Sequence, residues 1–308
     1  MNAVIEVDGV TRRYRSTTAL DAVSVRFEKD VIHGLLGRNG AGKTTLMSMI
    51  TAQEWPSSGD VRVFGQHPHE NEQVLPRICF VREEQQYIDD ARASHAFAAA
   101  AMAFPRWDQE FAEQLAADFK VPEKTRIKKM SRGQRSAVGV IIGLASRAEV
   151  TFFDEPYMGL DAVARQLFYD RLLADYAEHP RTIVLSSHLI DEIAHLIEHV
   201  VLLDEGRVVL DEPVEQLRDR AVTLVGRADA VGELTAGRTV LQHEAMGRTA
   251  RTTVLGGLDD GERRRAGELD LDLLPVSLQQ LVVHLTSKTE QHEQHEQHER
   301  HEQRERSA

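Results

Sequence analysis

The glycine-rich loop Gly37–Thr44 constrains the fold of this chain more than any other segment. It matches the pattern G-x-x-x-x-G-K-[ST] and stands between the apolar segment Val31–Leu36 and a predicted helix over 42–50. Glycines let the backbone wrap closely, so that successive N–H groups and the helix dipole point at phosphate oxygens. Lys43 is then expected to reach the β- and γ-phosphates, and Thr44 to ligate Mg²⁺. This strand–loop–helix unit predicts a nucleotide site rather than a structural turn.

Apolar segments alternate with helical patterns after this loop. Further strands are expected at Val150–Phe153 and Thr182–Ser186, with helices starting near residue 131 and over about 161–178. Strands that alternate with helices indicate a mostly parallel sheet covered on both faces. Two β-rich segments, Val4–Val7 and Val23–Phe27, predict a small N-terminal sheet. The fold class is therefore α/β.

The composition excludes several classes of function. The 308 residues carry a formal net charge of -12, which argues against a nucleic-acid surface. The single cysteine, Cys79, excludes an internal disulfide framework and fits a reducing cytoplasm. Neither a secretory signal at Met1–Glu6 nor a membrane span is expected, since the longest apolar run, Ala96–Phe104, is shorter than the roughly 20 residues of a spanning helix. A role in a membrane process would thus require a partner.

Two acidic residues follow the apolar strand that ends at Phe153. Asp154 and Glu155 are delivered to the carboxyl end of this strand, where α/β proteins bind ligands. Asp154 is expected to hold Mg²⁺, and Glu155 to polarise the attacking water as general base. Acids after a strand often belong to a solvated loop, but their occurrence downstream of Lys43 favours the functional interpretation.

A third element, Ser131–Gln134, lies between these two motifs. By itself the Ser-x-Gly-Gln pattern at the start of a predicted helix indicates an N-cap with a polar first turn. The order of the three motifs, however, resembles the ATPase subunit of an ATP-binding cassette (ABC) transporter. The resemblance covers most of residues 1–218 and implies a P-loop ABC nucleotide-binding domain with a mostly parallel core sheet, a small N-terminal antiparallel sheet and a helical subdomain at about 85–148.

The resemblance also implies roles for single residues. Lys43, Glu155 and His188 would act in catalysis, with His188 touching the γ-phosphate, and Tyr14 would stack on adenine. The γ-phosphate of ATP held by a second copy of the chain would be capped by Ser131, Gly133 and Gln134. Asp161 would also contact this second copy. The implied ATP-binding set is Tyr14, Gly37, Asn39, Gly40, Ala41, Gly42, Lys43, Thr44, Thr45, Ser131, Gly133, Gln134 and Asp161.

The sequence departs from the family at one site position. The family usually has a glutamine that contacts Mg²⁺ after a strand like Ile78–Val81, whereas this chain has Glu83, followed closely by Gln85. The metal ligands implied by the resemblance are thus Thr44, Asp154 and Glu83, and whether Glu83, Glu84 or Gln85 takes the glutamine's place stays open.

The last part of the chain has a different pattern. Residues 219–287 contain short glycine-broken strands, which predict a small C-terminal α+β domain ending in a helix with Ser277 as N-cap. Residues 288–308 repeat Glu, Gln and His without apolar positions, which predicts a solvated tail, disordered or a frayed helix.

The leading functional hypothesis is the ATP-hydrolysing motor subunit of an ABC exporter. It would form a homodimer in the ATP-bound state and lie on the inner face of the cell membrane through a multispanning permease. The segment Ala103–Asp108 resembles a bacterial branch that pairs with compact export subunits; the alternative is that Trp107 only anchors the helical subdomain. Two other functions stay open: a soluble ABC ATPase without a transport role, and an ATP-sensing regulator with little turnover.

Overall fold

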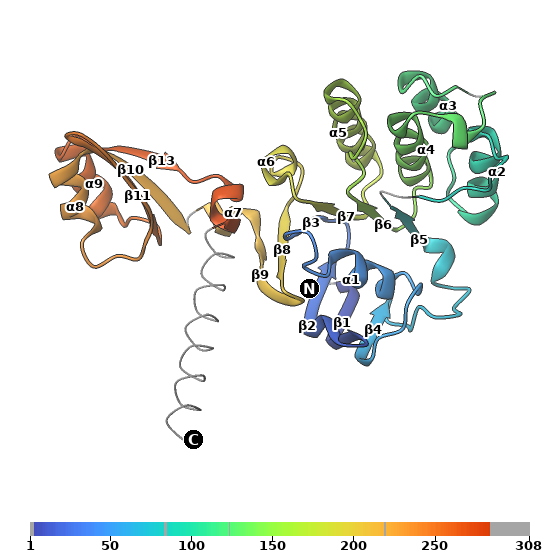
Figure 1. Cartoon of the computed structure of the whole chain (residues 1–308), viewed down its shortest axis with the longest axis horizontal. Helices are drawn as coiled ribbons and strands as arrows, with labels where there is room; N and C mark the ends of the chain where they lie inside the picture. The colour runs from blue at the N-terminus through green and yellow to red at the C-terminus, as the bar shows by residue number, and fades with distance from the viewer. Residues whose placement is uncertain (1–2, 83–84, 123, 219, 284–308) are drawn as a thin grey trace. The chain divides into compact units, whose positions relative to one another are not determined.

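The computed structural model describes residues 3–82, 85–122, 124–218 and 220–283, and these divide into two compact units (Figure 1). The first unit contains the residues up to His188 together with His195–Asp211, and the second contains Leu189–Ala194 and the described residues after 211. Over the described ranges, no helix has the length and apolar character needed to cross a membrane. The predicted domain limits 1–218 and 219–287 stay predictions, and the tail at 288–308 lies outside the described residues.

The first unit is built around a six-stranded sheet with the strand order β5-β6-β7-β3-β8-β9. The strands from β5 to β8 in this order pair in parallel. β3, β6 and β7 are buried at every residue, as expected of strands with helices on both faces. The predicted parallel core sheet is therefore confirmed. Its strands are β3 (Ile32–Leu36), β5 (Ile78–Val81), β6 (Val150–Asp154), β7 (Thr182–Ser187), β8 (His199–Asp204) and β9 (Arg207–Pro213).

Helices lie on both sides of this sheet, with α1 (Lys43–Ile50) on one side and α4 (Arg132–Ala145) and α5 (Ala162–Glu178) on the other (Figure 1). The small N-terminal sheet is also present, in the order β2-β1-β4 with antiparallel pairing. Its strands are β1 (Ala3–Tyr14), β2 (Thr17–Glu28) and β4 (Ser58–Val63). The apolar residues of α1 share one core with strands of both sheets, and this core anchors the helix that follows the glycine-rich loop.

The helical region consists of α2 (Ala93–Ala103), α3 (Gln109–Asp118) and α4, with a 3₁₀ turn at Ile127–Lys129, whereas the 3₁₀ turn at Leu75–Arg77 directly precedes β5. Asp108 begins α3 by accepting a hydrogen bond from the backbone N–H of Phe111 at 2.9 Å. The Trp107 ring lies 6.2 Å from the Phe97 ring, centroid to centroid, and its indole N–H donates to Gln109 at 2.9 Å. Trp107 thus joins α2 to the start of α3, which agrees with an anchoring role.

The second unit contains a four-stranded antiparallel sheet in the order β11-β12-β10-β13. Its element order is β10 (Ala221–Arg227), α8 (Ala228–Thr235), β11 (Val240–Met246), β12 (Thr249–Leu255), α9 (Asp260–Glu268) and β13 (Asp272–Pro275). This is the β-α-β-β-α-β arrangement of ferredoxin-like folds. Apolar residues of α8 and α9 share a core with β10 and β12.

Short helices complete the second unit. They are α6 (Ile190–Ile193), α7 (Val214–Arg218) and a last described helix over 278–283. The hydroxyl of Ser277 accepts the backbone N–H of Gln280 at 3.2 Å, and the Gln280 side chain accepts the backbone N–H of Ser277 at 3.2 Å. This reciprocal pair confirms Ser277 as the N-cap of the last helix.

Candidate functional site

The glycine-rich loop adopts a backbone that requires its glycines. Gly37 has a φ of 147°, and a Cβ at this position would lie 2.3 Å from the carbonyl oxygen of Leu203. Gly42 has a φ of 104°, and a Cβ there would lie 2.7 Å from the carbonyl oxygen of Ala19. The loop is therefore held tightly against neighbouring backbone, and α1 starts directly after it. Free N–H groups at the start of a helix form an anion site.

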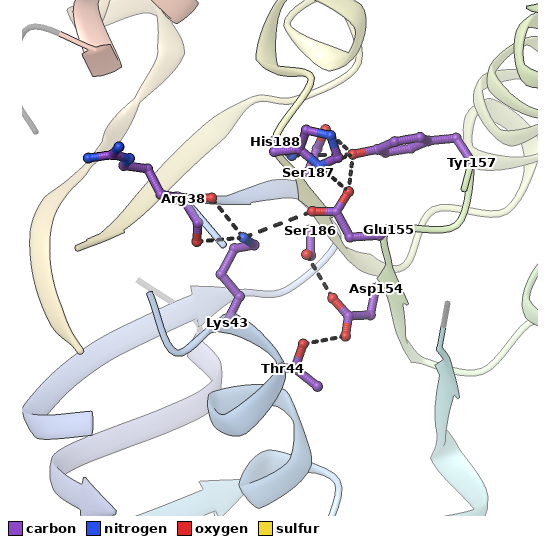
Figure 2. Close-up of polar contacts among 10 residues, drawn as sticks. Arg38, Lys43, Thr44, Asp154, Glu155, Tyr157, Ser186, Ser187 and His188 are labelled. Carbon is purple, nitrogen blue, oxygen red and sulfur yellow. Dashed lines mark hydrogen bonds and ion pairs between the residues drawn. The ribbon is translucent and has the colours of Figure 1, made fainter. Parts of the chain in front are cut away.

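Lys43, the first residue of α1, is almost fully buried at 6% exposure. Its ammonium donates to the carbonyl oxygens of Gly37 at 2.7 Å and Arg38 at 3.2 Å, and it lies 3.9 Å from Oε1 of Glu155 (Figure 2). Burial lowers the pKa of Lys43 below its ordinary value, and the carboxylates of Glu155 and Asp154 oppose part of this shift. The loop thus holds a buried cation that can exchange its carbonyl partners for phosphate oxygens.

The next residue, Thr44, connects α1 to the end of β6. Its hydroxyl donates to Oδ2 of Asp154 at 2.6 Å, and Oδ1 of Asp154 accepts from the Ser186 hydroxyl at 2.8 Å (Figure 2). Ser186 lies directly beside Asp154 in the register of β6 and β7. Both carboxylate oxygens of this buried aspartate are therefore engaged and their direction is defined.

The Thr44 hydroxyl and the Asp154 carboxylate fit Mg²⁺ in chemistry. This ion prefers oxygen ligands and binds through one or two carboxylates together with substrate phosphates. The two side chains are in direct contact, so one ion can reach both when their hydrogen bond opens. Where residues are described, no group of three His, Cys, Asp or Glu side chains gathers as a metal site. Glu83, the third predicted ligand, lies outside the described residues, as does Glu84.

Glu155 lies between the loop lysine and a histidine. Its Oε2 atom is 2.8 Å from Nδ1 of His188, and its Oε1 atom faces the Lys43 ammonium (Figure 2). The residue is buried and has a φ of 49°, in the left-handed region that residues other than glycine seldom adopt. The structure thus brings Lys43, Thr44, Asp154, Glu155 and His188 into one group.

Ser131 and Gln134 begin α4 as a capping box. The Ser131 hydroxyl accepts the backbone N–H of Gln134 at 3.2 Å, and the Gln134 side chain accepts the backbone N–H of Ser131 at 3.1 Å. A Cβ on Gly133 would lie 2.6 Å from the carbonyl oxygen of Gly159, so α4 packs closely on the loop after β6. Within one chain these residues have the N-cap role that the sequence left open, and their role towards a second copy stays a prediction.

Tyr14 and Asp161, two further predicted contacts, are held by local partners. Tyr14 is 38% exposed at the end of β1; its hydroxyl bonds to the Glu54 carboxylate, and the Arg12 guanidinium lies 4.5 Å from the ring centroid. Asp161 begins α5 by accepting the backbone N–H of Ala164 at 2.8 Å. In the loop, Asn39 and Gly40 are exposed, Ala41 is buried and Thr45 is half-buried.

Two contacting residues were not predicted from the sequence. Ser186 holds Asp154, and Tyr157 holds Glu155 and His188. Ser186 precedes His188 at the end of a predicted strand, so placing the two strands side by side would have indicated its contact. Tyr157 lies in the segment between the acids and Asp161, and its sequence position alone does not indicate that its hydroxyl turns back towards Glu155.

Comparison with known sequences supports the family that the order of the three motifs indicated. The sequence model of the family described as ABC transporter matches residues 20–158. The ABC transporter ATP-binding protein YtrB of Bacillus subtilis (strain 168) is 26% identical over 190 residues, which cover 62% of this chain and 65% of YtrB. AlbC of the same organism, which carries the same family name, is 30% identical over 212 residues, which cover 62% of this chain and 84% of AlbC. The chain therefore spans slightly less than two thirds of the length of YtrB.

A relative named for import is similar at the same level. The arabinose import ATP-binding protein AraG of Burkholderia pseudomallei (strain K96243) is 28% identical over 204 residues, which cover 63% of this chain and 40% of AraG.

Solved structures share the fold. The ATP-binding subunit of an ABC transporter superposes with a TM-score of 0.63 at 22% identity, over 70% of this chain and 92% of that chain. The dimeric ATP-binding cassette MJ0796 bound to ADP and phosphate superposes with a TM-score of 0.61 at 19% identity, over 68% of this chain and 98% of that chain.

Proposed function

Since this chain belongs to the ABC transporter family of ATP-binding proteins, we propose that it binds and hydrolyses ATP to drive transport through a separate membrane subunit. The observation that supports this proposal best is the convergence of Lys43, Thr44, Asp154, Glu155 and His188 at the end of the glycine-rich loop. A buried cation, hard oxygen ligands and a carboxylate beside them are what phosphoryl transfer to water requires.

The side chains take distinct parts in the proposed reaction. Lys43 neutralises charge on the β- and γ-phosphates, while Thr44 and Asp154 hold Mg²⁺. Bound Mg²⁺ supplies charge neutralisation at the β- and γ-phosphate oxygens. Glu155 accepts a proton from the water whose oxygen forms the new bond to the γ-phosphorus, while the bond from that phosphorus to the bridging oxygen of ADP breaks. His188 donates a hydrogen bond to the γ-phosphate, and Tyr14 stacks on adenine.

A second copy of the chain completes the proposed site. Ser131, Gly133 and Gln134 lie at the start of α4, where the helix dipole favours an anion such as the γ-phosphate of ATP held by the other copy. Asp161 lies at the start of α5 and contacts the partner copy in this arrangement. ATP binding would thus close a homodimer, and hydrolysis would open it.

The membrane partner in this proposal is a multispanning permease, which holds the chain at the inner face of the cell membrane. We assign export as the direction because the segment Ala103–Asp108 resembles a branch that pairs with export subunits. The similarity to AraG, named for import, makes direction a separate question for experiment.

The decisive test is Glu155→Gln in the full-length chain with ATP and Mg²⁺. Loss of the general base should lower the rate of hydrolysis by about 10²- to 10⁴-fold and leave ATP binding intact. Glu178→Gln, which changes an exposed glutamate at the end of α5, is the matched control and should keep the wild-type rate. Light scattering should detect a dimer of the Glu155→Gln protein with ATP.

The same variant identifies the partner. Recovery of a multispanning protein in near-equal amount from gently solubilised membranes of the native host would support the transport role. A closed dimer with only soluble partners or ribosomes would favour an ABC ATPase without a transport role. Tight ATP binding by the wild-type chain without hydrolysis would favour the regulator.

A further inference from the structure

Tyr157 lies in the tight turn that follows the two acids. The turn is closed by a hydrogen bond from the backbone N–H of Met158 to the carbonyl oxygen of Glu155 at 3.0 Å. The Tyr157 side chain is buried at 2% exposure, and its ring lies 5.9 Å from the His188 ring, centroid to centroid. The turn therefore points a phenol back towards Glu155 (Figure 2).

The Tyr157 hydroxyl has a complete set of partners. It contacts Oε2 of Glu155, lies 3.0 Å from the Ser187 hydroxyl and 3.2 Å from Nδ1 of His188, and accepts the backbone N–H of His188 at 3.2 Å. A phenol has one proton to donate, and an ionised carboxylate only accepts. The proton is therefore assigned to the bond with Glu155, while Ser187 and the His188 backbone donate to the phenol oxygen.

The phenol stays a neutral donor. Burial raises the pKa of Tyr157 above its ordinary value of 10.0, and the hydrogen bond to Glu155 raises it further. The other two partners of the Glu155 carboxylate differ from Tyr157, because both can bind phosphate oxygens. The Lys43 ammonium and the His188 ring face Glu155, so a triphosphate competes with Glu155 for them.

We propose that Tyr157 is a positioning residue that keeps the Glu155 carboxylate in place when Lys43 and His188 turn to the phosphates. The proposal rests on the function assigned above, in which Glu155 is the general base. Glu155 has a left-handed backbone and a flexible side chain, so its carboxylate direction depends on such contacts. The neutral phenol in the turn is the partner that ATP does not compete for.

The test is Tyr157→Phe in the full-length chain, which removes the hydroxyl and keeps the ring. Because the lost hydrogen bond is made to a charged group, kcat for ATP hydrolysis should fall about 10- to 100-fold. KM for ATP should stay within about 2-fold of wild type, because the buried hydroxyl acts on Glu155 rather than on substrate binding. Tyr169→Phe is the matched control: Tyr169 is also buried, at 3% exposure in α5, and its variant should keep both constants.

A second measurement separates positioning from an effect on the fold. In the Glu155→Gln background, Tyr157→Phe should lower the single-turnover rate by less than 2-fold, because the carboxylate it serves is gone. A further loss as large as in the wild-type background would overturn the inference, and so would an unchanged kcat or a rise in KM with constant kcat.

Failure of the inference is distinct from failure of the proposed function. Wild-type hydrolysis that Glu155→Gln abolishes and Tyr157→Phe leaves unchanged would overturn the inference alone. A wild-type chain that hydrolyses no ATP, alone or with its permease, would overturn both.

Discussion

His33 is a buried histidine whose protonation should destabilise the first unit in mild acid. It lies in β3 at 0% exposure, with ring centroids 5.1 Å from Phe27 and 5.4 Å from His199. Its Nε2 atom accepts the backbone N–H of Glu28 at 3.1 Å. Burial lowers the pKa of His33 from 6.5 to about 4, and His199 lowers it further, while the Glu28 carbonyl and Asp211 oppose the shift.

The size of the effect follows from the two pKa values. Below about pH 6.5 the unfolded chain binds a proton at His33, whereas the native chain excludes it until about pH 4. Stability from this residue is thus complete above pH 6.5 and is lost as the pH falls towards 4. Each pKa unit corresponds to about 1.4 kcal/mol, so the full difference is about 3 kcal/mol, of which about 2 kcal/mol is lost between pH 7 and pH 5.

The assay is urea unfolding of the full-length chain at pH 7 and pH 5, compared with His33→Gln. Both tryptophans, Trp55 and Trp107, lie in the first unit, so their fluorescence reports its unfolding. Wild type should lose about 2 kcal/mol more than His33→Gln between the two pH values. His95→Gln, at an exposed position in α2, is the control and should follow wild type. Equal losses in wild type and His33→Gln would refute the reasoning.

Two glycine substitutions should act in opposite directions. Gly143→Ala places a Cβ 2.4 Å from the Phe153 ring and 2.8 Å from Val81, so overpacking should destabilise the first unit by about 1–3 kcal/mol, less up to about 1 kcal/mol of gained helix propensity. A tryptophan-monitored urea midpoint at or above that of wild type would contradict this. Gly232→Ala, in α8, meets no atom within 4 Å and should stabilise the second unit by about 0.5–1 kcal/mol. Calorimetry should find the unfolding temperature of the second unit raised in this variant. A lowered unfolding temperature would show that the space around Gly232 is not open.

Features set by neighbours along the chain were predictable. The loop Gly37–Thr44 needs glycine at left-handed positions, and the lysine and threonine that follow are placed by the first turn of α1. Ser277 caps its helix through contacts three residues apart, and such contacts form as soon as the helix forms. The alternation of strands and helices indicated the parallel sheet because both elements leave periodic apolar patterns.

Features set by pairing between distant segments could not be predicted from the sequence. The sequence indicated only a small α+β unit after 218, whereas the order β11-β12-β10-β13 depends on which strand pairs with which. Many pairings are compatible with short glycine-broken strands, so their patterns do not select one.

The site divides in the same way. The sequence by itself predicted one nucleotide site, with Lys43, Asp154 and Glu155 placed by their local motifs and His188 added by the resemblance to the family. Only the tertiary structure decided that Ser186 holds Asp154 and that Tyr157 holds Glu155 beside His188. The first contact depends on the parallel register of β6 and β7, and the second on a turn that reverses direction and buries its tyrosine. Neither register nor the direction of a buried side chain is encoded by residues within a few positions along the chain.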